Sequence, residues 1–382
     1  MNELPTTLDD TYERMLQAIP KEKFQHASRL LQCMVAALRP LRVEELAEIF
    51  AIEFGPNNML NLVADWRPEN AEEAVLSTCS TFITIIDDGG SKFAHFSHFS
   101  VEEFLTSDRL QMSDVGNICQ YHIPLEAAHA ILARACVIVL LQSDEKGSKR
   151  FEALPLASYA AKNRVTHTQF GDVASRIQDS LAYLFDPPHF RPRILLRSVT
   201  SVYSKRPIFF GTNPDTLTPL FLAAFCGFSG LVKHLIVTHA LDVDAQCDHG
   251  WSALHGASSR GQVDSVRVLL DHEANVNAVG WSGNTPLHYA SLYGHLKVTQ
   301  LLLEHDADLD AQTAFYQTAL YMASEDGRLE IVRILLDHGA DVTVQDFNGL
   351  TPYEVATRRG HRDVAQLLLE YGAESAGGHD EG

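Results

Sequence analysis

The sequence predicts a mainly α-helical protein that ends in an α-solenoid of five stacked helical repeats. A six-residue segment recurs five times, starting at Thr218, Ser252, Thr285, Thr318 and Thr351. Near-constant spacing of this kind, at a period of about 33 residues, is typical of stacked helix pairs. Upstream, apolar residues recur at helical spacing around a single hairpin signal. Hydrophobic residues make up 46% of the 382, which favours packed cores over disorder.

Residues 1–112 are predicted to form a helical unit around one β-hairpin. Thr7 and Asp10 have the spacing of a capping box at the start of a helix over 7–19. Strands over 82–86 and 92–96, joined by Asp-Asp-Gly-Gly, form the hairpin. Further helices are expected over 21–38, 43–52, 71–80 and 100–110, the last opened by a Ser100/Glu103 capping box. Helices, a hairpin and a final helix are the order of a winged-helix unit with a small β wing.

Direct nucleic-acid binding is not expected. Winged-helix proteins that bind DNA use their third helix, and here that helix carries Glu44, Glu45 and Glu48 without a basic residue. Residues 207–382 hold 23 acidic and 9 basic side chains, out of a whole-chain net charge of −19. Phosphate backbones would be repelled by both regions.

Three segments, Leu4–Arg14, Arg39–Ala47 and Phe93–Leu105, resemble the winged-helix region of fungal NACHT-type signalling NTPases. In those proteins this region follows the NTPase and precedes ankyrin or other repeats, and its histidine, His98 here, contacts nucleotide phosphate. The chain has no G-x-x-x-x-G-K-[ST] loop. We therefore expect a core or capping role for His98, with nucleotide sensing through an NTPase partner in trans as the alternative. A stand-alone protein and a truncated NACHT–ankyrin gene product are both left open.

Residues 113–206 are predicted to form a helical connector, with helices over 118–141, 154–162 and 170–184. Prolines after residue 186 mark its end. The last part of the connector is basic and is expected to be a solvated linker. The alternatives are contact with the acidic repeats and a weak nuclear-import or phosphate-binding patch. Its basic residues are Arg191, Arg193, Arg197, Lys205 and Arg206.

Each repeat is predicted to be a pair of helices. The six-residue segment begins with a capping Thr or Ser, followed in three copies by Pro at the first helical position. A glycine in the left-handed conformation ends this first helix, and an apolar run forms the second. One repeat cannot bury its apolar face alone, so the repeats must stack. The phased glycines are Gly227, Gly261, Gly294, Gly327 and Gly360.

This pattern closely resembles the ankyrin-repeat family over 207–374, with 375–382 as a disordered tail. The resemblance implies a concave protein-binding surface made of turn tips and the inner faces of the first helices. Its aromatic members would form an exposed stripe, a feature that monomers rarely leave uncovered; the alternative is that they fold back onto neighbouring turns. By register, the partner-binding candidates are Asp248, His249, Trp251, Arg260, Trp281, Tyr293, Phe315, Glu325, Asp326, Phe347, Arg358 and Arg359.

No catalytic residue, metal site or cofactor is predicted. The six cysteines lie far apart without a C-x-x-C pair. His361-Arg362-Asp363 copies a kinase triplet but lacks the required Asn, and His255 and His288 fit structural positions of the repeat. The longest apolar run has seven residues, and no secretory signal is visible. An intracellular protein is expected, cytoplasmic or alternatively nuclear.

These observations predict a non-catalytic adaptor or scaffold that binds protein partners through its repeats, in signalling or regulation. The alternative is a nuclear ankyrin-repeat transcription coregulator that acts through a bound transcription factor. Neither function requires direct contact with nucleic acid or a membrane.

Overall fold

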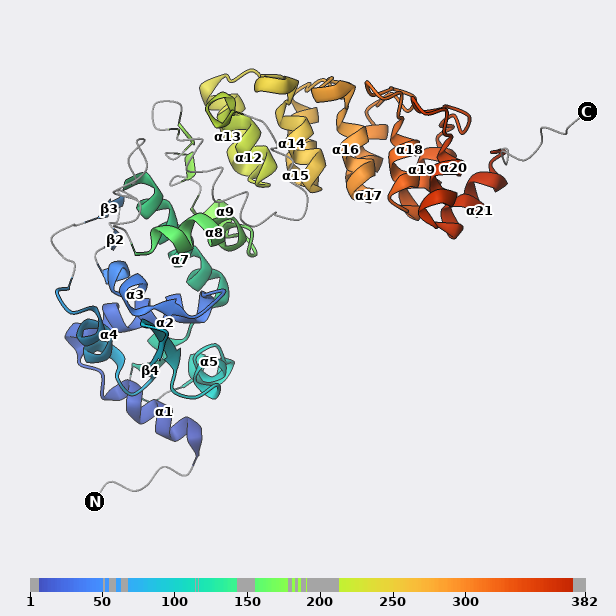
Figure 1. Ribbon diagram of the computed structural model, residues 1–382. Helices are drawn as coiled ribbons and strands as arrows, with labels where there is room; N and C mark the ends of the chain where they lie inside the picture. The colour runs from blue at the N-terminus through green and yellow to red at the C-terminus, as the bar shows by residue number, and fades with distance from the viewer. Residues whose placement is uncertain are drawn as a thin grey trace, which may run out of the picture. The chain divides into compact units, whose positions relative to one another are not determined.

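A computed structural model describes residues 7–50, 52–54, 60–62, 68–113, 115, 117–142, 155–177, 181–182, 185–186, 190 and 213–373. The chain divides into two compact units, residues 1–184 with 194–207 (unit 1) and residues 185–193 with 208–382 (unit 2). The predicted mainly helical fold is confirmed, with a small antiparallel sheet in unit 1 and helical repeats in unit 2 (Figure 1). The basic linker and the tail lie outside the described residues, and the domain boundaries stay predictions.

Unit 1 begins with α1 (Leu8–Gln17), whose predicted capping box is formed: Asp10 N donates to Thr7 Oγ1 at 3.1 Å, and Thr7 N to Asp10 Oδ2 at 3.0 Å. A 3-10 turn (Lys21–Lys23) leads into α2 (Phe24–Ala36). Two shorter helices, α3 (Val43–Phe50) and α4 (Ala71–Cys79), follow. All four predicted helices are therefore present, with α3 ending before Ile52.

A three-stranded antiparallel sheet lies beside these helices. The predicted hairpin is confirmed as β4 (Ile83–Asp88) and β5 (Ser91–Phe96). β1 (Leu41–Arg42) pairs with β5, which gives the order β1-β5-β4. A second pair, β2 (Ile52–Phe54) and β3 (Leu60–Leu62), is also present. The sequence did not predict β1, β2 or β3, because strands of two or three residues are too short to show an alternating pattern.

The helix predicted over 100–110 is divided into α5 (Ser100–Leu105) and α6 (Asp108–Gln111). Its expected capping box is wrong: the N-cap residue of α5 is Phe99, without a side-chain cap bond. Ser100 Oγ instead lies 2.8 Å from the hydroxyl of Tyr12 and 2.6 Å from His98 Nδ1. The serine thus joins α5 to α1 rather than closing its own helix.

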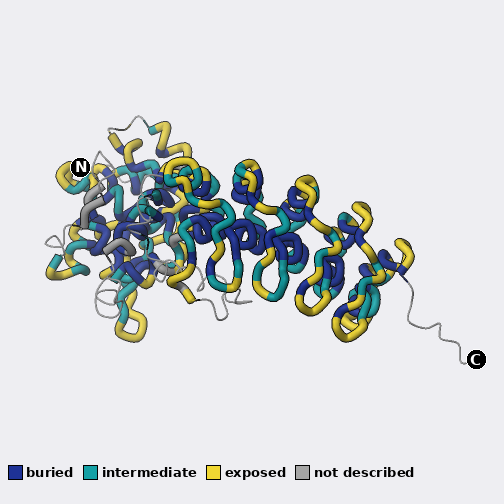
Figure 2. The backbone as a smooth tube through the Cα atoms, turned by 90° about the horizontal axis from the view of Figure 1, so that it is seen from above, coloured by how far each residue is buried: buried dark blue, intermediate teal, exposed yellow. Residues whose placement is uncertain are grey.

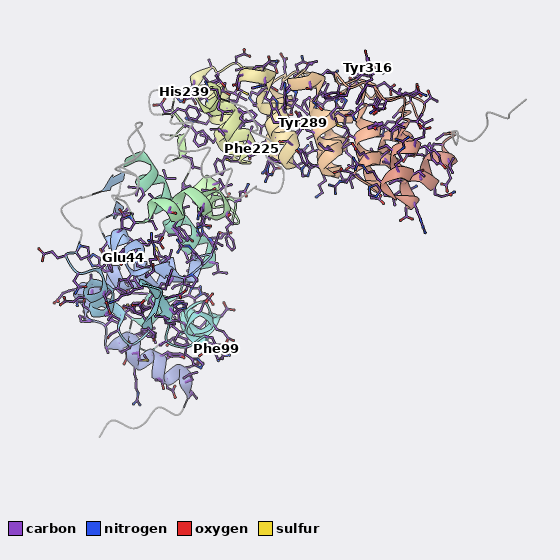
Figure 3. The ribbon with its side chains drawn as sticks, in the orientation of Figure 1. Glu44, Phe99, Phe225, His239, Tyr289 and Tyr316 are labelled. Carbon is purple, nitrogen blue, oxygen red and sulfur yellow. The ribbon has the colours of Figure 1, made fainter. Side chains whose placement is uncertain are left out.

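Only one of the three α3 glutamates on which the predicted repulsion of phosphate rests is exposed. Glu45 is fully buried, and its carboxylate accepts hydrogen bonds from both Nη atoms of Arg39, at 2.7 and 2.9 Å, and from the main-chain N–H of Arg42 at 2.8 Å. Glu48 is buried and accepts from Leu156 N at 2.6 Å. Glu44 is exposed (Figure 3). Two of the three carboxylates therefore stabilise the interior and do not repel an approaching phosphate.

The connector helices pack against the N-terminal helices. The expected long helix over 118–141 is interrupted at residues 122–124, which separate a 3-10 turn (Ile118–Tyr121) from α7 (Leu125–Gln142). α7 packs on α2 and on α8 (Ala157–Thr168), and α9 (Val173–Arg176) follows. One hydrophobic core extends from Tyr12 to Ala160, so both regions of unit 1 share a common interior.

Unit 2 contains the five predicted helix pairs. The first helices of the repeats stack on one another, and each packs against the second helix of its own repeat. Figure 2 shows the buried helices of this unit with exposed loops at their ends. The first helices are α12 (Pro219–Phe225), α14 (Ala253–Arg260), α16 (Pro286–Tyr293), α18 (Ala319–Glu325) and α20 (Pro352–Arg359). The second helices are α13 (Ser229–His239), α15 (Val263–Asp271), α17 (Leu296–Leu303), α19 (Leu329–Asp337) and α21 (Arg362–Glu370).

Candidate protein-binding site

Four loops join the second helix of one repeat to the first helix of the next. We call them fingers 1 to 4, and their tips are residues 248–250, 281–283, 314–316 and 347–349. Main-chain hydrogen bonds join neighbouring tips: Ala314 N donates to Ser282 O at 2.6 Å, and Phe347 N to Phe315 O at 3.0 Å. Fingers 2, 3 and 4 are thus connected directly and support one another.

Side-chain hydrogen bonds repeat along the bases of the fingers. In each step, an Asp or Asn side-chain oxygen accepts the main-chain N–H of a residue 31 positions later, at the base of the next finger. The three bonds run from Asn275 N to Asp244 Oδ1 (3.0 Å), from Asp308 N to Asn277 Oδ1 (2.8 Å) and from Asp341 N to Asp310 Oδ1 (3.0 Å). The fingers are therefore fixed at their bases, so their tips project from a rigid support.

Two buried histidines connect the helices to the fingers, as predicted. Nδ1 of His255 accepts from Ser252 N at 3.1 Å, which leaves the proton on Nε2, and Nε2 donates to Asn284 O at 3.1 Å. His288 repeats this arrangement between Thr285 N and Gln317 O, at 3.1 and 3.0 Å. Burial lowers the pKa of each of the two histidines to about 4. Both are neutral at pH 7, which the hydrogen-bond pattern requires.

Trp251, a predicted binding residue, is buried with 4% of its surface exposed. Its ring centroid lies 4.7 Å from that of Tyr289 in the third repeat and 6.2 Å from that of Phe221 in the first. Phe221 belongs to α12 and Tyr289 to α16, so the Trp251 ring lies within the stack of first helices. The expectation of an exposed side chain at this position is wrong.

The other predicted finger aromatics are exposed: Trp281 by 52%, Phe315 by 50% and Phe347 by 61%. They pair across neighbouring fingers, with ring centroids 5.5 Å apart for His249 and Trp281 and 5.9 Å apart for Phe315 and Phe347. These contacts leave about half of each of the three large side chains accessible. The two alternatives from the sequence thus hold together: the aromatic side chains pack partly onto neighbouring fingers, and they still form an exposed stripe.

Tyr316 was missed as a site residue, although it follows Phe315 in the same tip. Its side chain is 57% exposed, and it lies at the loop edge of unit 2, whereas Tyr289 lies among the helices (Figure 3). The sequence did contain an indication of this residue, because finger 3 has Tyr316 at the position where the other three fingers have glycine.

Most of the predicted charged residues have partners within unit 2. Arg359 forms an ion pair with Glu325 of the preceding repeat, which raises the pKa of the Arg359 guanidinium. Asp326 lies 3.5 Å from Arg328, and Asp248 accepts from Thr216 Oγ1 at 2.7 Å.

The three remaining predicted residues lie at the C-terminal ends of the first helices α14, α16 and α20. The guanidinium of Arg260 lies 5.2 Å above the ring of Phe225. Tyr293 is half-buried, with its ring centroid 6.2 Å from that of His295, and Arg358 is exposed. Several of the predicted charged residues thus have partners within unit 2, whereas Trp281, Phe315 and Phe347 remain about half exposed.

His98 belongs to unit 1 and is exposed. Its Nδ1 accepts from Ser100 N at 3.3 Å, and its ring centroid lies 4.3 Å from that of Phe99, whose side chain is 81% exposed. This contact satisfies a main-chain N–H at the start of α5. The expected core or capping role is thus met by its capping part: His98 is not the N-cap residue and is exposed, but its ring accepts a main-chain N–H in the first turn of α5, and nucleotide sensing stays a prediction.

Within the described part of the chain, no three His, Cys, Asp or Glu side chains gather as a group that could hold a metal ion. The helices in these residues are all too short or too polar to cross a membrane.

Comparison with known proteins identifies the repeats. A family model described as "Ankyrin repeats (3 copies)" matches residues 220–313 and 308–376. The C-terminal part of this protein thus consists of ankyrin repeats, which imply protein binding. "Neurogenic locus notch homolog protein 1" of Xenopus laevis and of Xenopus tropicalis is 47% identical over 60 residues, 16% of this chain and 2% of each relative.

A distant relative covers more of the chain. "Azaphilone pigments biosynthesis cluster protein L" of Monascus ruber is 28% identical over an alignment of 293 residues, which covers 72% of this chain and 61% of that protein. The chain thus spans about three fifths of this relative. Because the matched share of the chain exceeds the length of the repeats, the similarity extends into unit 1.

Proposed function

We propose that this protein is a non-catalytic adaptor or scaffold in intracellular signalling or regulation, and that it binds a protein partner through the fingers of its ankyrin repeats. The observation that carries the proposal is the row of half-exposed aromatic side chains Trp281, Phe315 and Phe347 on mutually hydrogen-bonded fingers. Large aromatic side chains contribute most of the binding energy in many interfaces, and rigid support lowers the entropy that binding costs.

The proposed surface differs from the one that the sequence predicts. Trp251 is excluded because it is buried, and Tyr316 is added because it is exposed beside Phe315. The ion pair of Glu325 with Arg359 holds the fourth and fifth repeats in register. Partner contact is thus assigned chiefly to the fingers and less to the inner faces of the first helices.

For unit 1, we propose a correspondence with the winged-helix and connector region of fungal NACHT–ankyrin proteins. The order of helices, hairpin and final helix supports it, and so does the extension of the Monascus similarity beyond the repeats. An NTPase partner in trans would meet His98 at an accessible position beside the exposed Phe99. This proposal is independent of the finger surface.

Crosslinked affinity capture from the native cell tests the adaptor function. The full chain is compared with a Trp281→Ala/Phe347→Ala variant and with a Val237→Ala control, which truncates an exposed apolar side chain at 64% exposure on α13. We expect a partner that wild type and the control capture and the double variant loses. Equal capture by all three proteins would refute the finger surface. A captured transcription factor, with nuclear accumulation of the chain, would establish the coregulator alternative; a cytoplasmic signalling protein would establish the adaptor.

A further inference from the structure

Tyr316 has a backbone conformation that disfavours its own side chain. Its φ is +59°, in the left-handed region, and the residues at the corresponding position of the other fingers are Gly250, Gly283 and Gly349, with φ of +75°, +79° and +76°. Left-handed backbone is unfavourable for a residue with a Cβ, and especially for a bulky one. Six non-glycine residues of the described chain have a positive φ, and Tyr316 has the largest side chain among them. Finger 3 thus carries tyrosine where glycine would fold at lower cost.

The folded protein recovers little of this cost through burial, because the Tyr316 side chain is 57% exposed. Its main-chain N–H donates to Thr313 O at 2.9 Å, a bond that glycine would form equally well. Strained residues that persist at a surface point to a function of the side chain. The side chain of Tyr316 is therefore a candidate contact for a partner.

Tyr316, Phe315 and Phe347 are three exposed aromatic residues in the tips of fingers 3 and 4, and Tyr316 is next to Phe315 in the sequence. The two phenylalanine rings lie 5.9 Å apart, and the N–H of Phe347 donates to the carbonyl of Phe315. We call Phe315, Tyr316 and Phe347 the aromatic cluster. It offers a preorganised site for one or two apolar side chains of a partner.

The surroundings of the cluster are acidic. Residues 213–373 hold 20 acidic and 9 basic side chains, and Asp308, Asp310 and Asp341 are exposed at the bases of fingers 3 and 4. Arg328 and Arg359 offset little of this charge, because they pair with Asp326 and Glu325. A partner with Lys or Arg beside its apolar anchors would thus gain favourable electrostatics, whereas an acidic segment would be repelled.

We propose that the aromatic cluster binds an extended basic segment of a partner protein, in which apolar side chains alternate with Lys or Arg. This inference rests on the proposed protein-binding function and specifies the chemistry of the partner. In an extended chain, side chains two residues apart point to the same face and lie about 6.6 Å apart. That spacing is close to the 5.9 Å between the rings of Phe315 and Phe347, so alternating apolar side chains would reach consecutive fingers.

The test is selection of a random peptide library on the immobilised full chain. We expect enriched peptides that are net basic and contain aromatic or aliphatic residues. The most enriched peptide is then labelled with fluorescein, and its affinity is measured by anisotropy at low and high salt. Binding should weaken at high salt. Acidic enriched peptides, or no enrichment over uncoated beads, would overturn the inference.

Tyr316→Gly gives the decisive comparison, because the two expected effects have opposite signs. The variant should melt at a higher temperature than wild type and yet bind the selected peptide at least tenfold more weakly. Tyr316→Phe retains the ring and should bind within about twofold of wild type. Unchanged peptide affinity in Tyr316→Gly would refute the role of the cluster.

These outcomes are separable from those of the capture experiment. If Trp281→Ala/Phe347→Ala loses its native partner while the selected peptides are acidic or insensitive to Tyr316→Gly, only the present inference fails. If the native partners are retained by that double variant, the proposed function fails.

Discussion

His288 Nε2 lies 3.0 Å from the carbonyl oxygen of Gln317, so a side chain of the third repeat holds the base of finger 3. Gln317 directly follows Tyr316 in the sequence. A neutral, buried histidine in the first helix of the third repeat is thus hydrogen-bonded to the residue that follows the tip of finger 3. His255 supports finger 2 in the same way through Asn284.

The repeats should lose stability as the pH falls from about 6.5 to about 4. Burial lowers the folded-state pKa of His255 and His288 from 6.5 to about 4, so below pH 6.5 the unfolded chain binds protons that the folded chain does not. The stability that they contribute is complete above pH 6.5 and declines below it. At pH 5 we expect a loss of roughly 2 kcal/mol for each histidine.

Hydrogen exchange of peptides from α14 and α16, at pH 7 and pH 5, measures this loss locally. The control is His255→Gln/His288→Gln, because the Gln amide does not titrate. The pH-dependent loss should be much smaller in that variant. If wild type and the double variant lose the same protection between pH 7 and pH 5, titratable groups other than His255 and His288 cause the acid sensitivity.

Trp251→Ala should destabilise the first three repeats, whereas Trp281→Ala should not. Trp251 is 4% exposed between Phe221 and Tyr289, and Trp281 is 52% exposed. Removal of a buried tryptophan costs roughly 3–5 kcal/mol, while an exposed position changes stability by about 0.5 kcal/mol or less. Thermal unfolding of the two variants checks the difference. A similar melting temperature for both would contradict the buried placement of Trp251.

Gly256→Ala should destabilise α14, although alanine normally stabilises a helix by about 1 kcal/mol relative to glycine. A Cβ at this position would lie 2.9 Å from Cε2 of the buried Phe221 ring. The overlap should convert the gain into a net loss of roughly 1–2 kcal/mol. In a Phe221→Leu background the substitution should become neutral or favourable. Denaturant unfolding of wild type, the two single variants and the double variant gives the coupling energy between positions 256 and 221. If the effects of the two substitutions on the free energy of unfolding are additive, the contact between the new Cβ and the Phe221 ring is excluded.

Glu45→Gln should destabilise unit 1, while the adjacent Glu44→Gln should have little effect. Glu45 is buried and accepts from Arg39 and from the main chain of Arg42, whereas Glu44 is exposed. Hydrogen bonds to charged groups contribute about 1.5–3 kcal/mol, so we expect a loss of roughly 2 kcal/mol for Glu45→Gln. Hydrogen exchange in α3 and β1 distinguishes this effect from unfolding of the repeats. Equal exchange in both variants would contradict it.

Features within one helix or turn were predictable from the sequence. The capping box of Thr7, the hairpin of β4 and β5 and the turn-bridging roles of His255 and His288 are all present. Each depends on residues close in sequence, or on a register that recurs from one repeat to the next. The Ser100 capping box was predicted wrongly because the partner of Ser100 is distant in sequence. Its hydroxyl contacts the hydroxyl of Tyr12, 88 residues earlier, and does not cap the helix with Glu103.

In the candidate site, too, some features were predictable from the sequence and others were not. The 33-residue register of the repeats predicted that Trp281, Phe315 and Phe347 lie on successive finger tips, and they are exposed. The register of the repeats did not predict that Trp251 is buried among the first helices. It also did not predict that Tyr316 has a left-handed backbone conformation and an exposed side chain. Whether these residues bind a partner stays a prediction.

By itself, the sequence determined the helix pairs, their period and the acidity of the repeats, because capping, glycine positions and apolar spacing act within a few residues along the chain. Only the tertiary structure decided which glutamates of α3 are buried and which aromatic side chains remain at the surface. Side-chain burial depends on packing between segments distant in sequence: Glu48 meets the N–H of Leu156, and Trp251 meets rings from two other repeats.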